Sequence, residues 1–220
     1  MKSIQLIALW LAVGLTTLST SAQTNRAHSE VDKWESSAFT YGEFKVGFGS
    51  TQFSSGLRER FEKGNFSSSG GGIATVAAYR KFEKLNHLHF GLKFKGLGAS
   101  PSSGDNDEEM FFNFWGTAFS TKYFPFNQAA VKGIYVQADY NFVTQFTQKY
   151  RNTTTLEFDH QFAIGNSFTI GLGFQYPLKK GYGVVASIEY DWATRQGEVQ
   201  GVGDQQFQNS NLAFQIGLLF

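Results

Sequence analysis

Four histidines are the residues of this chain best suited to acid–base or metal chemistry: His28, His87, His89 and His160. A hydrolytic site would need one of them close to a serine nucleophile and an orienting carboxylate. Asp159 precedes His160, but no motif fixes a serine beside that pair. His87 and His89 would share one face of a strand, yet two imidazoles do not complete a zinc site. We therefore predict that the protein is not an enzyme and has no catalytic residue, metal site or cofactor.

An acidic run from Asp105 to Glu109 (Asp-Asn-Asp-Glu-Glu) could attract a divalent cation. It lacks the glycine and the terminal glutamate spacing of a calcium-binding EF-hand loop. Because runs of like charge are usually exposed to water, we interpret this one as a solvated loop.

Further charged residues stand at alternate positions of extended segments, where they would all point to one side. The residues assigned to this inward set are Glu43, Lys45, Arg80, Lys93, Lys95, Lys122, Asp139, Glu189 and Asp191. Since an unpaired buried charge is costly, cations and carboxylates in a narrow interior must pair with one another or hold water. We favour an internal network of ion pairs, and a charge-lined passage for small ions is the alternative.

The elements that would position these charges are eight segments in which large apolar side chains alternate with small or polar ones. Their approximate ranges are 39–53, 71–83, 88–99, 110–124, 133–148, 156–177, 182–193 and 211–220. Successive side chains of a strand point to opposite faces, so each segment would have a lipid-facing row and an inward row. The pattern predicts an all-β fold, an eight-stranded antiparallel transmembrane β-barrel with up-and-down connections.

The lengths of the connections between segments suggest an orientation in the membrane. The connections after the second, fourth and sixth segments are short, whereas the others are longer and polar. Outer-membrane barrels place short turns in the periplasm and long loops outside. With an even number of strands, both chain termini are then expected on the periplasmic side.

The alternation also assigns individual side chains to one face. Turning Lys93 or Lys95 toward lipid would cost about 2 to 4 kcal/mol each near the bilayer midplane, so both are assigned to the interior. In segment 71–83, Arg80 is assigned to the interior and Tyr79 to the opposite face. In segment 133–148 the alternation is continued through Gln145, which is also assigned to the interior.

The last segment ends on a C-terminal phenylalanine and alternates almost without error. Its apolar outward row includes Phe214, Ile216, Leu218 and Phe220. This ending resembles the C-terminal signal that is read during insertion of bacterial outer-membrane β-barrels. The resemblance implies the barrel assembly machinery and periplasmic chaperones as partners during biogenesis.

Aromatic residues near the ends of the segments are expected to form girdles at the level of the lipid headgroups. These residues are Trp115, Tyr123, Tyr140, Tyr176, Tyr182, Tyr190 and Trp192. A carbohydrate-stacking platform is the alternative, but the aromatic residues of the connecting loops are few and scattered.

The N-terminus has the pattern of a cleaved secretory signal peptide over residues 1–22. Lys2 precedes an apolar run from Ile4 to Leu18, and small residues follow up to Ala22. The run is shorter than the ~20 residues that a spanning helix needs. Residues 23–37 are polar and are expected to form a flexible periplasmic segment, with the barrel at 38–220.

Composition narrows the class of protein. The chain has no cysteine, which excludes disulfides and thiolate metal sites, and its net charge of +1 provides no basic field for nucleic acid. Phenylalanine and glycine each number 24, which suits strands with rings facing lipid and small residues facing a tight interior.

With these features the chain resembles the small bacterial outer-membrane β-barrel superfamily, which includes the OmpA transmembrane domain, OmpX, OmpW and opacity-like barrels of the porin family. The resemblance rests on the eight alternating segments and the closing row, and it is architectural. With Gln23 directly after the signal site and its usage of phenylalanine and glycine, the chain also looks similar to barrels of Bacteroidetes-type bacteria. No peptidoglycan-binding domain follows the last segment, so an anchoring role is not expected. The charged interior departs from the hydrophobic lumen associated with OmpW-like barrels.

The resemblance implies residence in the outer membrane of a Gram-negative cell, among membrane lipids and lipopolysaccharide. We expect a structural or surface-interaction role, which covers envelope integrity, adhesion, or contact with a host or the environment through the long loops. The surface ligand is left open. A narrow channel for ions or small solutes is the alternative, and a lipid A-modifying enzyme is the least favoured hypothesis.

Overall fold

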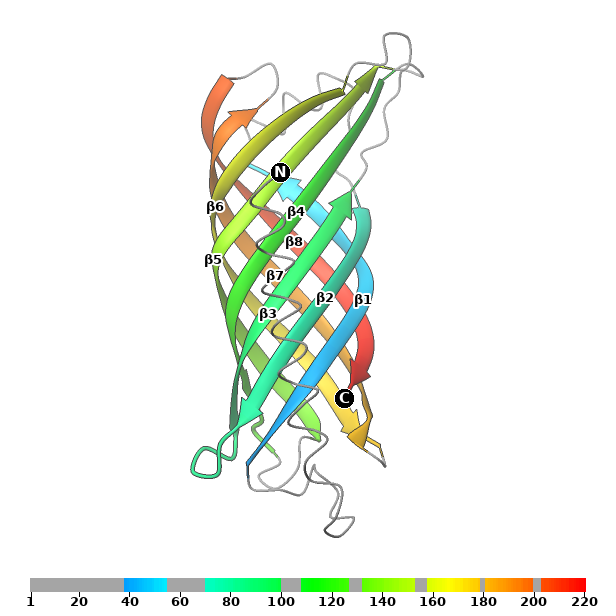
Figure 1. Ribbon diagram of the computed structural model, residues 1–220, viewed down its shortest axis with the longest axis vertical. Helices are drawn as coiled ribbons and strands as arrows, with labels where there is room; N and C mark the ends of the chain where they lie inside the picture. The colour runs from blue at the N-terminus through cyan, green and yellow to red at the C-terminus, as the bar shows by residue number, and fades with distance from the viewer. Residues whose placement is uncertain are drawn as a thin grey trace, which may run out of the picture. The chain divides into compact units, whose positions relative to one another are not determined.

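Figure 1 shows the computed structural model, which describes residues 38–54, 70–99, 108–126, 132–152, 158–178, 181–199 and 203–220. The expected signal peptide and the 23–37 segment lie outside the described residues, as does the acidic run apart from Glu108 and Glu109. No helix among the described residues is long and apolar enough to cross a membrane.

The described structure consists of strands that pair in chain order and close on themselves (Figure 1). The strands are β1 (Phe39–Phe53), β2 (Gly70–Lys81), β3 (Leu88–Ala99), β4 (Glu108–Tyr123), β5 (Gly133–Asn152), β6 (Phe158–Pro177), β7 (Gly183–Val199) and β8 (Gly203–Leu219). All neighbouring pairs are antiparallel, and β1 closes the sheet against β8. Because a closed sheet has no unpaired edge, its backbone groups are satisfied in lipid. The predicted eight-stranded antiparallel barrel is confirmed.

Alternating burial shows that the strands have the predicted two faces. In β8 the outward Ile216 is 68 % exposed, whereas the neighbouring Gln215 is 2 % exposed. The outward row of this strand contains the residues of the expected insertion signal, Phe214, Ile216 and Leu218, and it continues to Phe220 beyond the strand. The apolar side chains therefore point away from the barrel interior.

Several strands extend beyond the alternating apolar segments, most clearly β7 and β8. β8 begins at Gly203, where the apolar alternation begins only at 211, and β7 continues to Val199. Residues 203–210 contain a single large apolar residue, Phe207, so no periodic apolar signal marks them. Their backbone ladder with β7 nevertheless continues to the pair of Val199 and Gly203.

The face assigned to β2 was wrong, and Arg80 lies outside the barrel. Pairing with β3 places Ala77 beside Lys93, which is inward, so Tyr79 must also point inward and Arg80 outward. Arg80 donates a hydrogen bond to Thr40 Oγ1 over 3.2 Å near the end of the strand. The cost of a charge on the lipid face falls to about 0–1 kcal/mol near the membrane interfaces, so this position tolerates arginine.

The face assigned to Gln145 was also wrong, because a β-bulge interrupts β5. The register of β5 shifts between Asn141 and Val143 against β4, and between Asn141 and Thr144 against β6. Phe142 and Val143 are consequently both exposed. The inward row resumes at Thr144 and Phe146, and Gln145 falls on the outer row.

Two clusters of buried apolar and aromatic residues fill the interior at different heights. The turn-side plug lies toward the short connections and consists of Tyr41, Ala77, Tyr79, Phe124, Tyr135, Val185 and Leu219. The loop-side plug lies toward the longer connections and consists of Ile73, Leu97, Ala99, Phe112, Phe114, Phe146, Ala163, Phe207 and Ala213. Both plugs are made of the inward rows of several strands, so they hold the barrel wall from within.

Candidate functional site: a paired-charge layer between two plugs

Between the two plugs lies a layer of buried charges, which we call the paired-charge layer. It contains every residue of the expected inward set except Arg80, and its members are Glu43, Lys45, Lys93, Lys95, Lys122, Asp139, Glu189 and Asp191. The lysines come from β1, β3 and β4, and the carboxylates from β1, β5 and β7. Lys95 is the least enclosed member, with 13 % of its side chain exposed. Strands distant in sequence therefore meet here through opposite charges.

The first part of the layer is centred on Glu43 and Lys45 of β1. Glu43 pairs with Lys122 through Oε2 and with Lys45 through Oε1, the latter over 3.0 Å. Lys45 also donates to Glu189 Oε1 at 2.7 Å and to Ser187 Oγ at 3.0 Å. These contacts connect β1 to β4 on one side and to β7 on the other.

The second part of the layer continues from Glu189 through Lys93. Lys93 Nζ donates to Glu189 Oε2 at 2.6 Å and to Asp139 Oδ2 at 2.8 Å. Asp139 Oδ1 accepts further hydrogen bonds from Ser120 and from Gln137. The pairs thus form one continuous chain of alternating charges from β4 to β5, which compensates the cost of burying each of them.

A separate group surrounds Asp191 nearer the loop-side plug. Its Oδ1 accepts from Lys95 Nζ and Ser167 Oγ, each at 2.8 Å, and from Thr169 Oγ1 at 2.7 Å. Its Oδ2 accepts from Asn211 at 3.2 Å. With this many donors the carboxylate of Asp191 is fully satisfied.

Lys122 joins the paired-charge layer to the turn-side plug. Its Nζ lies 4.3 Å from the ring centroid of Tyr79 and 4.4 Å from that of Tyr135. A desolvated cation over an aromatic face gains about 2 kcal/mol or more. Tyr79 in turn forms a hydrogen bond with Ser120 Oγ at 2.8 Å, so the plug and the charges form one packed unit.

This arrangement is suited to stiffening the barrel. Every lysine of the layer is held by at least one carboxylate, as the ion pairs of Lys93 and Lys95 illustrate. A hydrated ion moving along the lumen would have to separate such pairs and pass the aromatic rings of both plugs. Each step would expose an unpaired charge in a low-dielectric interior, which is costly.

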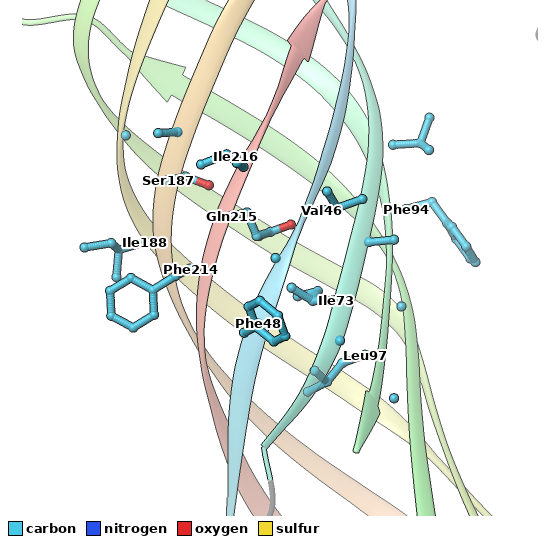
Figure 2. Close-up of a pocket in the computed structure, with 18 of the residues that line it drawn as sticks. Val46, Phe48, Ile73, Phe94, Leu97, Ser187, Ile188, Phe214, Gln215 and Ile216 are labelled. Atoms are coloured by element: carbon cyan, nitrogen blue, oxygen red, sulfur yellow. The ribbon is translucent and has the colours of Figure 1, made fainter. Parts of the chain in front are cut away.

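Figure 2 shows a pocket whose lining residues belong to both faces of the barrel wall. Phe48 and Phe214 face outward and are 78 % and 55 % exposed. Ile73 and Gln215, which also line the pocket, are buried in the interior. Because its lining mixes the two faces, this pocket does not define a ligand chamber within the lumen.

The two histidines whose side chains are described make local contacts. His87 Nδ1 lies 2.6 Å from the carbonyl oxygen of Phe124, and His89 Nδ1 lies 3.0 Å from the hydroxyl of Tyr41. His89 is inward and packs against Phe124 of the turn-side plug, with ring centroids 4.7 Å apart. Within the described part of the chain, no group of three or more acidic, histidine or cysteine side chains could hold a metal ion.

The aromatic residues expected at the membrane interfaces lie on the outer face. Trp115, Tyr123, Tyr140, Tyr176, Tyr182 and Trp192 are exposed, whereas Tyr190 is half-buried against Trp192, with ring centroids 4.6 Å apart. The ring of Trp115 covers Gly96 on β3, where a Cβ atom would lie 2.5 Å from the indole. Trp115 and Tyr123 are roughly 20 Å apart along the barrel axis, at ~3.3 Å per residue and a strand tilt of about 40°.

Arg195 is a buried interior residue that the apolar alternation did not reveal. It is 2 % exposed, donates to Asn209 Oδ1 and lies over the ring of Phe114 at 5.2 Å. Arg195 follows Glu189 and Asp191 in the same inward row of β7, so extending that row would have identified it.

Comparison with solved structures shows that the fold is that of outer-membrane β-barrel proteins. Ail, the attachment invasion locus protein of Yersinia pestis, matches over 82 % of this chain and 99 % of its own, with 9 % identity and a TM-score of 0.51; its structure is a complex with sucrose octasulfate, a heparin analogue. Neisserial surface protein A matches over 82 % of this chain and 97 % of its own, with 10 % identity and a TM-score of 0.48. No protein-family model and no curated protein sequence matches the chain.

Proposed function

We propose that this protein is an integral outer-membrane barrel that serves as a rigid platform for a polar, surface-exposed rim, and that its lumen is sealed. The observation that carries the proposal is the paired-charge layer enclosed by two plugs of apolar and aromatic side chains. A wall held together from within resists deformation and presents fixed strands to the outside. A structural or surface-interaction role fits this construction better than transport does.

The outer face of β7 and β8 supports a membrane boundary near Trp192. On one side of this level the outward residues are apolar, as Val184 and Ile188 show. On the other side the outward residues are polar, and they include Gln196, Glu198, Asp204, Gln206 and Gln208. A tryptophan at such a transition is typical of the interfacial girdle of a membrane protein.

The lengths of the strands support a rim that rises out of the membrane. β5 and β6 are each 20 residues long, whereas a tilted transmembrane strand needs about 9–11. The surplus lies at the end from which the longer connections leave, beyond the level of Trp192. Outer-membrane barrels expose such connections on the cell surface. The short turns and both termini of the chain would then face the periplasm.

Single-cysteine labelling in intact cells tests this orientation, because the chain contains no cysteine of its own. The variants are Gln206→Cys on the polar rim and Glu83→Cys at a short turn, and both residues are exposed. A maleimide reagent too large to cross the outer membrane should label Gln206→Cys in intact cells and Glu83→Cys only after permeabilisation. The opposite pattern would overturn the proposed surface rim. Absence of labelling of Gln206→Cys in intact cells would likewise contradict exposure of the rim on the cell surface.

A further inference from the structure

Arg195 is a buried cation that the paired-charge layer does not neutralise. The layer pairs its lysines with Glu43, Asp139, Glu189 and Asp191. Over the described ranges of the chain, no carboxylate forms an ion pair with Arg195. Since an uncompensated buried charge is strongly unfavourable, a negative partner at this position would be stabilising.

The guanidinium of Arg195 also has an unused hydrogen-bond donor beside a small internal cavity. The cavity has a volume of about 20 Å³, and Arg195, Lys95, Thr144 and Asn211 are among the residues that line it. Among the residues that the structure describes, neither Arg195 Nε nor the hydroxyl of Thr144 has a hydrogen-bond partner. Both groups are buried, so two donors are available where the cavity lies.

The carboxylates at the cavity do not use these donors. Glu189 lines the cavity but is already held by Lys45 and Lys93. Asp191 also lines it and already accepts from Lys95 and from four neutral side chains, Asn141, Ser167, Thr169 and Asn211. The positive charge of Arg195 therefore remains available to a mobile anion. Because a cavity of this size holds about one water molecule, only a monatomic anion fits.

We propose that the cavity beside Arg195 is an internal binding site for a chloride-sized halide ion. The ion would accept hydrogen bonds from Arg195 Nε and Thr144 Oγ1 and would neutralise the unpaired guanidinium. Such an ion would link β7 to β5 beneath the loop-side plug. It would bind the folded barrel and not the unfolded chain, so it would stabilise the fold by mass action.

The first test compares the thermal unfolding midpoint of the refolded barrel in detergent with sodium chloride, sodium bromide or sodium gluconate at equal ionic strength. We expect a saturable rise in the midpoint with chloride and with bromide but not with gluconate. The variant Arg195→Gln should lose this halide dependence, whereas Arg80→Gln, which removes an exposed arginine, should keep it. Equal midpoints of the wild-type protein in all three salts would overturn the proposal.

A second test uses the wild-type protein alone, so it does not depend on how well the variant folds. Crystals grown in bromide should give an anomalous-scattering peak in the cavity beside Arg195 Nε. A peak of ordinary water density at that place, without anomalous signal, would show that the cavity holds water and would contradict the halide site.

Discussion

The ring of Phe220 lies against Gly42, where the two ends of the barrel sequence meet. The amide of Gly42 donates to the carbonyl of Phe220 over 2.7 Å, and the amide of Phe220 donates back over 3.1 Å. A Cβ atom at Gly42 would lie 2.3 Å from Cε2 of Phe220, so glycine leaves the space that the ring occupies. The last residue thus continues the closing ladder of β1 and β8 by one further pair.

Deleting Phe220 is predicted to impair assembly more than it weakens the finished barrel. The deletion removes the final pair with Gly42 and the last outward ring, but it leaves the β1–β8 ladder from Glu43 to Phe53 intact. Outer-membrane yield should fall severalfold while the urea unfolding midpoint of the refolded protein changes little. Phe119→Ala, which removes an outward ring from β4 and lies outside the C-terminal row, is the matched control. Equal yields of the truncated and full-length proteins would refute the prediction.

Gly42→Ala is predicted to reproduce part of this assembly defect without shortening the chain. The new methyl group would displace the ring of Phe220. Gly72→Ala is the control, because a Cβ atom at Gly72 meets nothing within 4 Å. The folded fraction is read from heat-modifiable migration on unboiled gels. Equal folded fractions of the two variants would show that the contact between Gly42 and the ring of Phe220 does not contribute to assembly.

Lys93→Met is predicted to destabilise the barrel by about 3–5 kcal/mol, because it leaves the buried Asp139 without a cation and removes one of the two lysines that hold Glu189. Lys93 lies within 2.8 Å of Asp139 and 2.6 Å of Glu189. Lys84→Met removes an exposed lysine from a short turn and should change the free energy of unfolding by less than about 0.5 kcal/mol. Urea unfolding in detergent micelles provides the comparison. Similar free energies for the two variants would show that the buried pairs contribute little.

Gly173→Ala is predicted to destabilise the turn-side plug by about 1–3 kcal/mol. A Cβ atom at Gly173 would lie 2.2 Å from Cζ of Tyr135, whose side chain is fully buried and cannot move aside freely. The same measurement on Gly72→Ala should show at most the small change expected for a site with open space. A Gly173→Ala barrel as stable as the wild type would mean that the plug is loosely packed.

The sequence was sufficient to predict the barrel because a lipid environment requires large apolar side chains on the outer face of each strand, in alternation with small or polar ones on the inner face. Lys93 and Lys95 could be placed inside from the cost of turning them toward lipid, and the structure places both there. Phe214 and Ile216 were assigned to the outer row by the same rule. Strand number, pairing and the outward apolar row all follow from this one physical constraint.

What the sequence did not predict depends on depth in the membrane and on pairing between distant strands. Arg80 was misplaced because the penalty for an outward charge is small near the interface. Arg195 and the start of β8 were missed because the outward residues of the rim are polar and Phe207 is the single large apolar residue of 203–210, so no apolar period marks this part of the chain. The partners of each lysine depend on barrel closure: Lys45 binds Glu189 on β7, which no local pattern could indicate.

Planar-bilayer recordings of the purified wild-type barrel test the central claim, which is that the paired-charge layer and its plugs seal the lumen. We expect no steady conductance from the wild-type protein, because an ion would have to separate buried pairs such as Lys93 with Glu189. Steady unitary currents whose ion selectivity reverses in Lys93→Glu would contradict the account and would establish a charge-lined channel.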